Sequence, residues 1–453
     1  MRGTKYQTAE EILRHALDAV GKPLGTIDQT GRLRTGKGSI GTVVEESWFG
    51  YKPNSKSEPD FPEAGIELKV IPFVRKREGI RAKERLVCNI IDYMEEYKKT
   101  FLTSSFWHKC EKMLLMPYEH KYDVPKSEFE IKAALLFQFP EEDLIIIQQD
   151  WQKIIQKIRS GKAHELSEGD TLYLAACTKG ATSADVRPQP FSNILAKQRA
   201  YSLKQSYMTQ ILQTYVFGEN TDPKIITDWH QLEHESFEQY LLNKIKPYYG
   251  MTQSELKLRF GIRNNPKNIN ELILARILGV TGQISTTEEF KKAAINPKTI
   301  RIQKNGAIKE SMSFPAFKFI PLSQETVWEE SELYGMLAEK KFMFVIFKEN
   351  LTGNFVLEKV LFWNIPYKDL QQVEIVWRKT VETIRNGVVI TRRNNRNYNN
   401  LPKQTENPVA HVRPHGINSR DTDLLPDGRQ MTKQCFWLNN SYIHEQIEKH
   451  LSQ

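Results

Sequence analysis

Residues 66–71 alternate between two kinds of side chain. Ile66, Leu68 and Val70 alternate with Glu67 and Lys69 within the segment GIELKVIPF. This period of two predicts a β-strand, because successive side chains of a strand point to opposite faces. On such a strand Glu67 and Lys69 share one face, and the apolar residues occupy the other.

Similar patterns along the chain predict both kinds of element. Helical spacing predicts helices in AEEILRHALDAV (9–20), KERLVCNIIDYMEEY (83–97), QDWQKIIQKIRSG (149–161) and INELILARILG (269–279). Short apolar or alternating runs predict further strands in KMLLMPYE (112–119), TLYLAAC (171–177), FMFVIFK (342–348) and VLEKVLFWN (356–364). The mixture predicts an α/β fold with a mixed central sheet flanked by helices.

The two halves of the chain resemble each other. Segments 139–161 and 365–387 share eight residues at a constant offset of 226, for example Trp151 and Trp377. KQRAYSLKQSY (197–207) also matches KQCFWLNNSY (433–442), and KVIPF (69–73) matches KFIPL (318–322). Three matching blocks in the same order predict two tandem copies of one fold, in domains 1–218 and 228–453, with a turn-rich linker at 218–224.

Asp60, Glu67 and Lys69 form a candidate catalytic cluster. Asp60 follows Pro59, where we expect the chain to turn. Two adjacent carboxylates repel each other unless a cation lies between them, and Mg²⁺ prefers such oxygen ligands. A neighbouring lysine can orient a metal-bound water or help it ionise, so the set predicts metal-assisted phosphodiester hydrolysis. A solvated Glu–Lys pair on an exposed strand produces the same spacing, so the interpretation needs support from the rest of the chain.

The second copy offers a comparison for this cluster. When Lys318 is aligned with Lys69, Lys309 lies opposite Asp60 and Ala316 lies opposite Glu67. The lysine is kept and both acids are lost. This difference predicts one catalytic domain and one domain that binds without catalysis.

The net charge of the chain indicates which class of molecule it binds. The 453-residue chain carries a net charge of +9, which favours a polyanion, with nucleic acid the leading candidate. Its four cysteines lack the spacing of a CxxC pair or a zinc site. The N-terminal segment lacks the apolar core of a signal peptide, and no apolar run has the length of a membrane span. We therefore expect a cytoplasmic protein that has no membrane association.

Several segments resemble the MutH-like endonucleases. They are GTVVEESWFG (41–50), KSEPDFPEAGIELKVIPF (56–73), SSFWHKCEKMLLMPYE (104–119), SEGDTLYLAACTKGA (167–181) and KQRAYSLKQSYM (197–208), and the likeness continues to MTKQCFWLNNSYI (431–443). The resemblance implies a duplicated MutH-like fold and a type II restriction endonuclease that cuts double-stranded DNA before the G of GATC. It also implies Mg²⁺ dependence and a C-terminal domain that binds a second GATC site as an allosteric effector.

The resemblance implies roles for individual residues. Asp60 and Glu67 match metal ligands, Lys69 matches the catalytic lysine, and Lys109 matches a further active-site lysine. One more acid comes from the helix before this motif, where the chain offers both Glu45 and Glu46. Glu46 is favoured because it keeps the family spacing to WFG (48–50) and to Asp60. No residue is assigned as general base.

Three groups of residues are candidate DNA contacts. In the loop CTKGA (177–181), Lys179 can reach a base or a phosphate, and Gly180 permits close backbone approach. The second group is a basic and aromatic cluster: Lys197, Arg199, Tyr201 and Lys204. The third lies in the second copy, where the loop matching CTKGA holds His411, Arg413 and His415, and Lys433 matches Lys197. An ordinary turn explains the first group equally well, and a solvated helix face explains the second. Pro414 disfavours a helical His-x3-His metal site in the third.

Three functions stay open at this point. They are a GATC-cutting restriction enzyme, a mismatch-repair nicking endonuclease of the single-domain branch, and a DNA-binding protein that does not cut. The second domain argues against the nicking enzyme, and metal-dependent cleavage would exclude the third function. A monomer and a DNA-induced dimer both fit a chain with two such domains.

Overall fold

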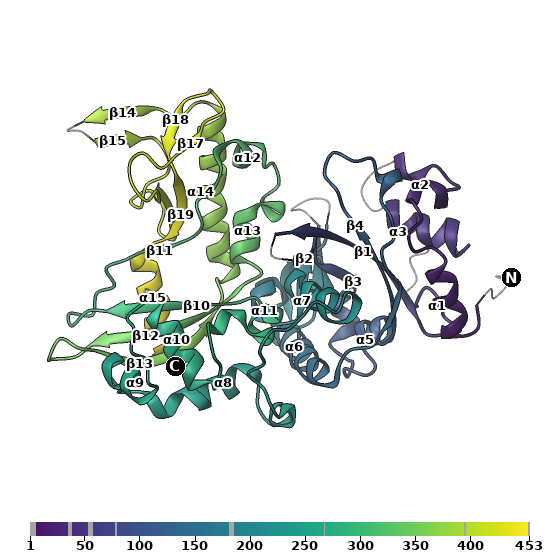
Figure 1. The fold of residues 1–453 in the computed structure, drawn as a ribbon, viewed down its shortest axis with the longest axis horizontal. Helices are drawn as coiled ribbons and strands as arrows, with labels where there is room; N and C mark the ends of the chain where they lie inside the picture. Colours follow the sequence, from purple (N-terminus) through teal and green to yellow (C-terminus); the bar gives the residue numbers. More distant parts are fainter. Residues whose placement is uncertain are drawn as a thin grey trace. The chain divides into compact units, whose positions relative to one another are not determined.

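The computed structural model describes residues 6–34, 39–52, 58–77, 79–180, 185–266, 268–393 and 396–451. Its contacts divide the chain into two compact units (Figure 1). The first unit contains residues 1–237 and 285–294, and the second contains 238–284 and 295–453. These units differ from the predicted domains, 1–218 and 228–453, at residues 219–237 and in the segment 285–294.

The first unit is built around two small sheets. One has the strand order β2 (Gly79–Ala82), β1 (Glu67–Lys76), β4 (Met113–Glu119), β5 (Leu135–Phe137), and the other has the order β3 (Leu86–Ile90), β9 (Arg199–Leu203), β6 (Leu174–Thr178). β1 and β4 are parallel, whereas the other pairs are antiparallel. A hairpin of β7 (Val186–Gln189) and β8 (Ser192–Lys197) stands beside them. The mixed sheet is therefore present in this unit.

Helices complete the first unit. They are α1 (Ala9–Leu17), α2 (Leu24–Ile27), α3 (Ser39–Val43), a π-helical turn (Val44–Trp48), α4 (Tyr93–Glu96), α5 (Ser105–Cys110), α6 (Glu141–Arg159), α7 (Gln205–Ile211) and α11 (Glu288–Ala293). α6 begins after Pro140 with three acidic residues in its first turn, where they complement the helix dipole. Its apolar stripe, which includes Ile147 and Trp151, is buried. α6 therefore supports the sheets from one long amphipathic face.

A buried ion cluster attaches α11 to the first unit. Lys292 Nζ lies 2.8 Å from Asp143 Oδ1 on α6 and 2.7 Å from Glu288 Oε1. The side chains of Lys292 and Asp143 are each 2% exposed. Burial lowers the pKa of Lys292, but the two carboxylates outweigh it and raise that pKa overall. The cluster explains why residues 285–294 belong to this unit although they lie late in the sequence.

The second unit also contains two three-stranded sheets. One has the order β10 (Ile295–Ile302), β12 (Lys341–Glu349), β13 (Phe355–Trp363), and the other has the order β11 (Met312–Ser313), β19 (Gln434–Leu438), β16 (Ala410–Pro414). β10 and β12 are parallel, and the remaining pairs are antiparallel. Two hairpins are added: β14 (Ile390–Arg393) with β15 (Arg396–Asn399), and β17 (Thr422–Leu424) with β18 (Gln430–Thr432). The helices are α8 (Phe237–Ile245), α9 (Gln253–Arg259), α10 (Ile269–Ile277), α12 (Phe319–Gln324), α13 (Glu332–Leu337), α14 (Tyr367–Arg385) and α15 (Asn440–Leu451).

One predicted helix is wrong. The segment KERLVCNIIDYMEEY (83–97) contains strand β3 and only the single-turn helix α4. In β3, Leu86 and Cys88 are buried while Val87 and Asn89 between them are partly exposed, so the local period is two. β3 pairs with β9, more than 100 residues later, and this non-local pairing decides the conformation.

The predicted match between KVIPF and KFIPL is also wrong. Lys69 lies within β1, whereas Lys318 is the N-cap residue of helix α12. KFIPL is thus helical where KVIPF is a strand. Arginines at the ends of the long helices α6 and α14 make similar contacts, since Arg159 donates to the carbonyls of Tyr97 and Lys99, and Arg385 donates to those of Ser323 and Glu325.

Candidate active site and nucleic-acid contacts

Strand β1 holds the first two residues of the candidate site. Glu67 and Lys69 lie two residues apart, so their side chains share a face of the strand. Lys69 Nζ donates to Glu67 Oε1 at 2.8 Å. The Glu67 side chain is 3% exposed and the Lys69 side chain 12%. The predicted Glu–Lys pair is therefore a largely buried pair and not a solvated one.

A tight turn brings Asp60 to the same strand. Phe61 and Ile66 form an isolated antiparallel bridge, and Asp60 Oδ2 accepts a hydrogen bond from the Leu68 amide at 3.0 Å. Burial and the negative charge of Glu67 raise the pKa of Asp60 to about 6, against the opposing effect of Lys69 and Lys109. The two carboxylates thus repel each other in the metal-free protein.

Lys109 completes the cluster from helix α5. Ser104 caps this helix by accepting the Trp107 amide, and Lys109 lies in the last turn. Its Nζ is 3.4 Å from Glu67 Oε1, and its side chain is 16% exposed.

Burial lowers the pKa of Lys69, but the charge of Glu67 and the hydrogen bond between Lys69 and Glu67 raise that pKa overall. Lys69 thus keeps a positive charge at this site.

The other oxygen of Glu67 bears on metal binding. Glu67 Oε2 is buried and has no hydrogen-bond partner among the described residues. A buried carboxylate oxygen without a partner, facing a second carboxylate whose pKa is raised, fits a divalent cation that is bound between them. Across the described ranges no three His, Cys, Asp or Glu side chains gather as a metal cluster. Mg²⁺ is commonly held by one or two carboxylates plus waters and substrate phosphates, so Asp60 and Glu67 suit it.

Glu46 lies in the π-helical turn before this motif. Its Oε2 accepts a hydrogen bond from Arg32 Nε at 2.8 Å, and its side chain is 24% exposed. In the part of the chain that is described, no hydrogen bond or ion pair joins Glu46 to Asp60 or Glu67. The choice of Glu46 over Glu45 as the helix acid therefore stays a prediction.

The CTKGA loop presents exposed basic groups. Lys179 and Gly180 are exposed, Ala181 lies outside the described residues, and the Lys179 amide donates to the Gln198 carbonyl at 2.9 Å. Gln198 also accepts a hydrogen bond from Arg187 on β7. The sequence reasoning missed Arg187, because only the β7–β8 hairpin brings it beside Lys179. Lys197, at the end of β8, is partly exposed.

Three members of the second predicted DNA-binding group are buried instead. Arg199 and Lys204 are each 3% exposed, and they donate to the carbonyls of Ala176 and Thr171. Tyr201 is fully buried, and its hydroxyl donates to Glu96. All three lie on or beside β9, a strand paired on both sides. The prediction that Arg199, Tyr201 and Lys204 contact DNA is wrong, because their polar groups are used inside the protein.

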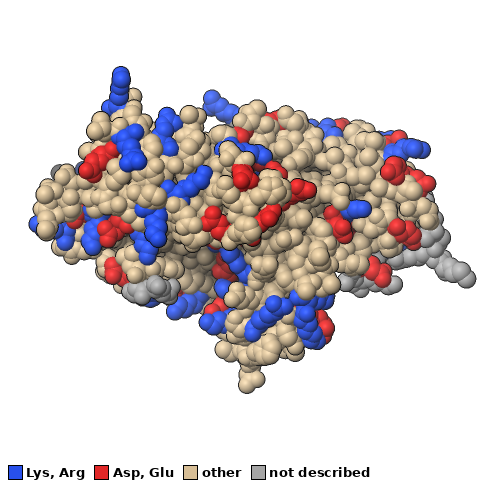
Figure 2. Space-filling view, turned by 90° about the horizontal axis from the view of Figure 1, so that it is seen from below, with Lys and Arg blue, Asp and Glu red and all other residues tan. Residues whose placement is uncertain are grey.

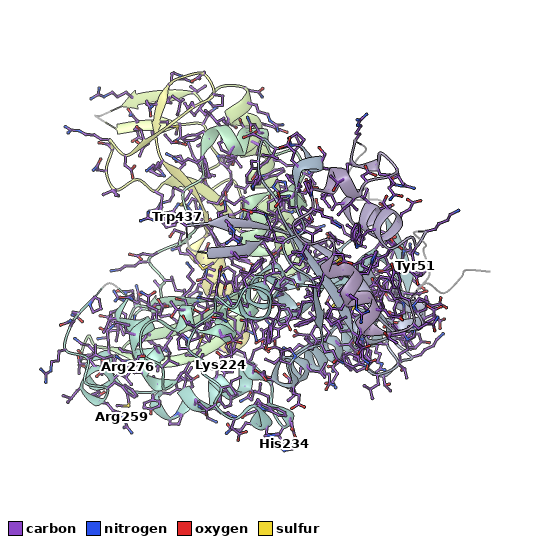
Figure 3. The ribbon with its side chains drawn as sticks, turned by 45° about the vertical axis from the view of Figure 1, so that its right-hand side comes forward. Tyr51, Lys224, His234, Arg259, Arg276 and Trp437 are labelled. Atoms are coloured by element: carbon purple, nitrogen blue, oxygen red, sulfur yellow. The ribbon has the colours of Figure 1, made fainter. Side chains whose placement is uncertain are left out.

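The third predicted group lies on a strand and not in a loop. His411 and Arg413 belong to β16, and His411 is 2% exposed with its Nδ1 2.6 Å from Asn439 Oδ1. Burial lowers the pKa of His411. Arg413 is exposed and lies 4.3 Å above the ring of Trp437, which is labelled in Figure 3. His411 is thus excluded from a DNA-facing surface, whereas Arg413 is available for one.

His415 and Lys433 lie next to Arg413. The His415 ring meets the same Trp437 ring edge to face at 5.5 Å, and the His415 amide donates to the Lys433 carbonyl. Lys433 Nζ pairs with Asp421 at 2.5 Å. On the face of the molecule in Figure 2, basic and acidic side chains are interspersed. The net charge of +9 therefore does not identify a DNA site on that face by itself.

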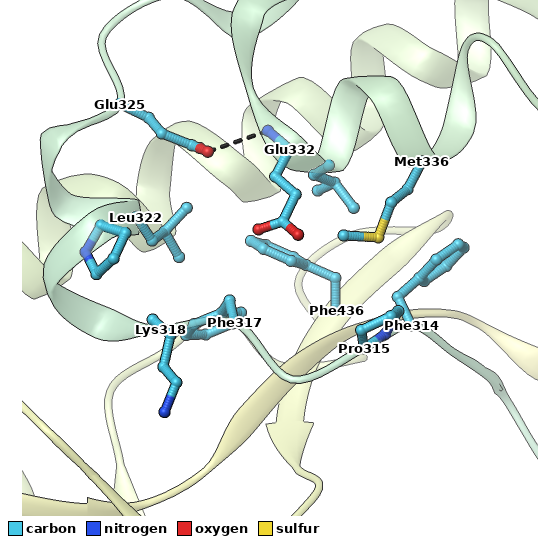
Figure 4. Close-up of a pocket in the computed structure, with 11 residues that line it drawn as sticks. Phe314, Pro315, Phe317, Lys318, Leu322, Glu325, Glu332, Met336 and Phe436 are labelled. Carbon is cyan, nitrogen blue, oxygen red and sulfur yellow. Dashed lines mark hydrogen bonds between the residues drawn. The ribbon is translucent and has the colours of Figure 1, made fainter. Parts of the chain in front are cut away.

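The residues of the second half that were aligned with Asp60, Glu67 and Lys69 have other surroundings. Lys318 pairs with Asp423 at 3.1 Å and lines an apolar pocket of about 190 Å³ with Phe314, Phe317 and Phe436 (Figure 4). Glu325 accepts the Glu332 amide at the edge of this pocket. Lys309 is exposed, and Ala316 lies in the turn before α12.

Comparison with known proteins identifies the class of the chain. The family model for the DNA mismatch repair enzyme MutH matches residues 49–150, which include Asp60, Glu67, Lys69 and Lys109. The chain is 30% identical to the DNA mismatch repair protein MutH of Shewanella woodyi, over 47% of this chain and 94% of that protein. It is 28% identical to the MutH protein of Serratia proteamaculans, over 47% of this chain and 95% of that protein. Residues 49–150 therefore form a domain of the MutH-like nuclease class.

A further relative covers the whole chain. The type II restriction enzyme Sau3AI of Staphylococcus aureus is 38% identical over 98% of this chain and 99% of its own length. The chain belongs to this MutH-like family of type II restriction enzymes, which are site-specific deoxyribonucleases. Within the described residues, no helix has the length and apolarity needed to cross a bilayer.

Proposed function

We propose that this protein cleaves double-stranded DNA before the G of GATC by Mg²⁺-dependent phosphodiester hydrolysis. The observation that carries the proposal is the environment of Glu67. Its Oε1 atom accepts a hydrogen bond from Lys69 and pairs with Lys109. Its Oε2 atom is buried and, among the described residues, has no hydrogen-bond partner. Phosphodiester hydrolysis needs positive charge around the scissile phosphate, and this arrangement offers it.

Each residue of the cluster has a distinct task in this proposal. Asp60 and Glu67 hold a divalent cation, which when bound supplies Lewis-acid activation of water and phosphate. Lys69, kept charged by Glu67, stabilises negative charge on the phosphate. Lys109 adds a second positive charge from helix α5. Glu67 also fixes the position of both ammonium groups through its Oε1 atom.

We infer that the second unit is a non-catalytic copy of the first. Strands β10, β12 and β13 repeat the parallel and antiparallel pairing of β1, β4 and β5, although no described strand of that sheet corresponds to β2, and α6 and α14 each contain 19 residues. Glu67 pairs with the first residue of β4, and Ile295 pairs with the first residue of β12. Pro297 then takes the position of Lys69. Lys109 follows the cap residue Ser104 by five positions, and Met336 follows the cap residue Ser331 by five. With Ile, Pro and Met at these positions, the second unit lacks counterparts of the carboxylate of Glu67 and of the charges of Lys69 and Lys109.

We propose that the second unit binds a second GATC site and thereby stimulates the first. Arg413, His415 and Lys433 are its candidate DNA contacts, beside Trp437. Among the first unit's candidates, Lys179, Gly180 and Lys197 remain in the proposal, with Arg187 added. Such coupling requires that DNA at one site raises the DNA affinity or the cleavage competence of the other site.

The same chain can act as a monomer or as a DNA-induced dimer. We place it in the cytoplasm, since its four cysteines are unpaired and buried.

The experiment is a cleavage assay with mapped ends. Purified protein with Mg²⁺ is incubated with a plasmid that carries a known set of GATC sites, and the fragment ends are sequenced. We expect linear fragments whose 5′ ends begin with GATC. Nicked circles alone would favour the mismatch-repair type of activity, and ends at other sequences would contradict the proposed specificity.

A further inference from the structure

The β14–β15 hairpin of the second unit has no counterpart between α6 and β6 of the first, a segment that the structure describes throughout. Between α6 and β6 the first unit has 14 residues (160–173), whereas between α14 and β16 the second has 24 (386–409). The additional chain forms the hairpin, which stands at the opposite end of the second unit from β10, β12 and β13 (Figure 1). Its sequence, ITRRNNRNYNN (390–400), lies in a stretch without any acid between Glu382 and Glu406. The hairpin therefore combines positive charge with amide side chains.

The base of the hairpin is held in a fixed position. Arg429 Nη2 donates to the Val388 carbonyl at 2.6 Å, and the Val389 amide donates to Asn400 Oδ1 at 2.9 Å. Asn399 Oδ1 accepts the Leu401 amide at 3.0 Å, and Ile390 packs against the core of the second unit. These contacts fix the register of the two strands, so the outer residues have defined neighbours.

Arg392 and Asn397 are direct cross-strand partners in this register. Both are exposed, and within the described part of the chain Arg392 has no ion pair. Directly opposed residues of an antiparallel pair have Cβ atoms roughly 5 Å apart. Adjacent base pairs of duplex DNA are stacked about 3.4 Å apart. An arginine and an asparagine side chain at this separation can reach the edges of neighbouring base pairs.

The residue types match the chemistry of two bases. Arg binds the O6 and N7 acceptors of guanine in the major groove, and Asn binds N6 and N7 of adenine. The major groove is wide enough for a two-stranded β-ribbon. We propose that the β14–β15 hairpin enters the major groove of the duplex bound by the second unit, where Arg392 reads G and Asn397 reads the adjacent A of GATC. This inference rests on the proposed DNA binding by the second unit, and it names the two residues that give that unit its sequence specificity.

The experiment measures binding of short duplexes to the full-length chain in a cleavage-deficient Glu67→Gln background. A stoichiometric titration first asks whether the parent binds two GATC duplexes per chain. We then expect Arg392→Ala and Asn397→Ala each to weaken the second binding event about ten-fold or more. The control Arg301→Ala removes one exposed positive charge from β10 of the same unit and should leave both events unchanged.

Base analogues identify which atom each side chain reads. Replacing guanine by 7-deazaguanine removes the N7 acceptor, and it should weaken second-site binding by the parent but not by Arg392→Ala. Replacing adenine by 7-deazaadenine should likewise affect the parent but not Asn397→Ala. If Arg392→Ala instead weakens binding to all sequences equally and lowers the salt slope by about 0.9, Arg392 contacts a phosphate and base reading is wrong.

The outcomes distinguish failure of the hairpin assignment from failure of the proposed DNA binding by the second unit. Two duplexes bound by the parent, with no effect of either hairpin substitution, would overturn the role of the hairpin and leave the second unit as a DNA-binding unit. A single duplex bound by the parent would overturn the proposed DNA binding of the second unit, and the hairpin assignment with it.

Discussion

Replacing Asp60 by Asn should stabilise the metal-free protein while removing its activity. Asp60 carries a pKa of about 6 against an ordinary value of 3.8, because burial and Glu67 disfavour its charge. That difference corresponds to about 3 kcal/mol of destabilisation once the carboxylate is ionised. Asn is neutral and nearly isosteric, and its Oδ1 can still accept the Leu68 amide. The free energy of unfolding should therefore increase by up to about 3 kcal/mol at neutral pH, which is roughly 6–12 °C in Tm for a unit of this size.

The pH dependence follows from the direction of this pKa shift. Below pH 3.8 Asp60 is protonated in the folded and unfolded states alike, so the substitution has no electrostatic effect. Between pH 3.8 and 6 the unfolded state loses the proton first, and the wild-type protein loses stability relative to Asp60→Asn. Above pH 6 the difference is complete and constant.

The assay is thermal unfolding in EDTA and in Mg²⁺, from pH 4 to pH 8. Mg²⁺ should raise the Tm of the wild-type protein, because it binds only the folded site, and it should not affect Asp60→Asn. The control is Asp28→Asn. Burial raises the pKa of Asp28 slightly, but hydrogen bonds from the Leu33 and Thr30 amides lower it overall, so neutralisation should reduce stability and leave the Mg²⁺ effect intact. A lower Tm for Asp60→Asn in EDTA at pH 7.5, or an effect that does not vary with pH, would refute this reasoning.

Three further predictions test other parts of the account. Lys292→Met leaves Asp143 and Glu288 buried without their cation, so it should lower the free energy of unfolding in denaturant by about 3–5 kcal/mol. Lys291→Met breaks the more exposed pair with Asp222 and should lower that free energy by less than about 1 kcal/mol. Equal losses for the two variants would contradict the role of burial. In Gly180→Ala the added Cβ would lie 2.7 Å from the Asp185 Cβ, so the loop must shift, and both the Tm and DNA binding should fall. Gly335→Ala, whose Cβ meets nothing within 4 Å, should leave DNA binding unchanged, and unchanged DNA binding by Gly180→Ala would contradict a role of this loop in DNA contact. Arg413→Ala with His415→Ala should abolish the faster cutting of two-site DNA over one-site DNA but spare basal cleavage, and persistent stimulation would exclude these residues as effector contacts.

The core of the catalytic cluster could be predicted because its determinants are local. The alternation around Glu67 predicts that its side chain and that of Lys69 share a strand face, and the 2.8 Å contact confirms it. The assignment of Lys109 to the site rests only on the resemblance to the MutH-like endonucleases. Its distance from Glu67 depends on helix α5 packing next to β1, and no local pattern encodes that packing.

Non-local pairing explains the predictions that were wrong. The apolar residues of 83–97 are spaced as in a helix, yet Leu86–Ile90 pairs with a strand more than 100 residues later. The basic and aromatic residues of 199–204 look like a DNA-facing cluster. The partners of Arg199 and Lys204, the carbonyls of Ala176 and Thr171, lie 23 and 33 residues earlier in the chain. Some basic residues donate to a backbone carbonyl elsewhere in the chain, and others bind a DNA phosphate. The sequence alone does not distinguish the two.

The central claim is that Asp60, Glu67, Lys69 and Lys109 form a metal-dependent DNA-cutting centre. The most direct test compares single-turnover cleavage of a GATC duplex by wild-type protein and Glu67→Gln across a Mg²⁺ titration, with DNA binding measured in parallel. The account predicts Mg²⁺-dependent cleavage before the G by the wild-type protein, and loss of cleavage with retained DNA binding for Glu67→Gln. Cleavage by Glu67→Gln within a few-fold of wild type, at any Mg²⁺ concentration, would contradict it.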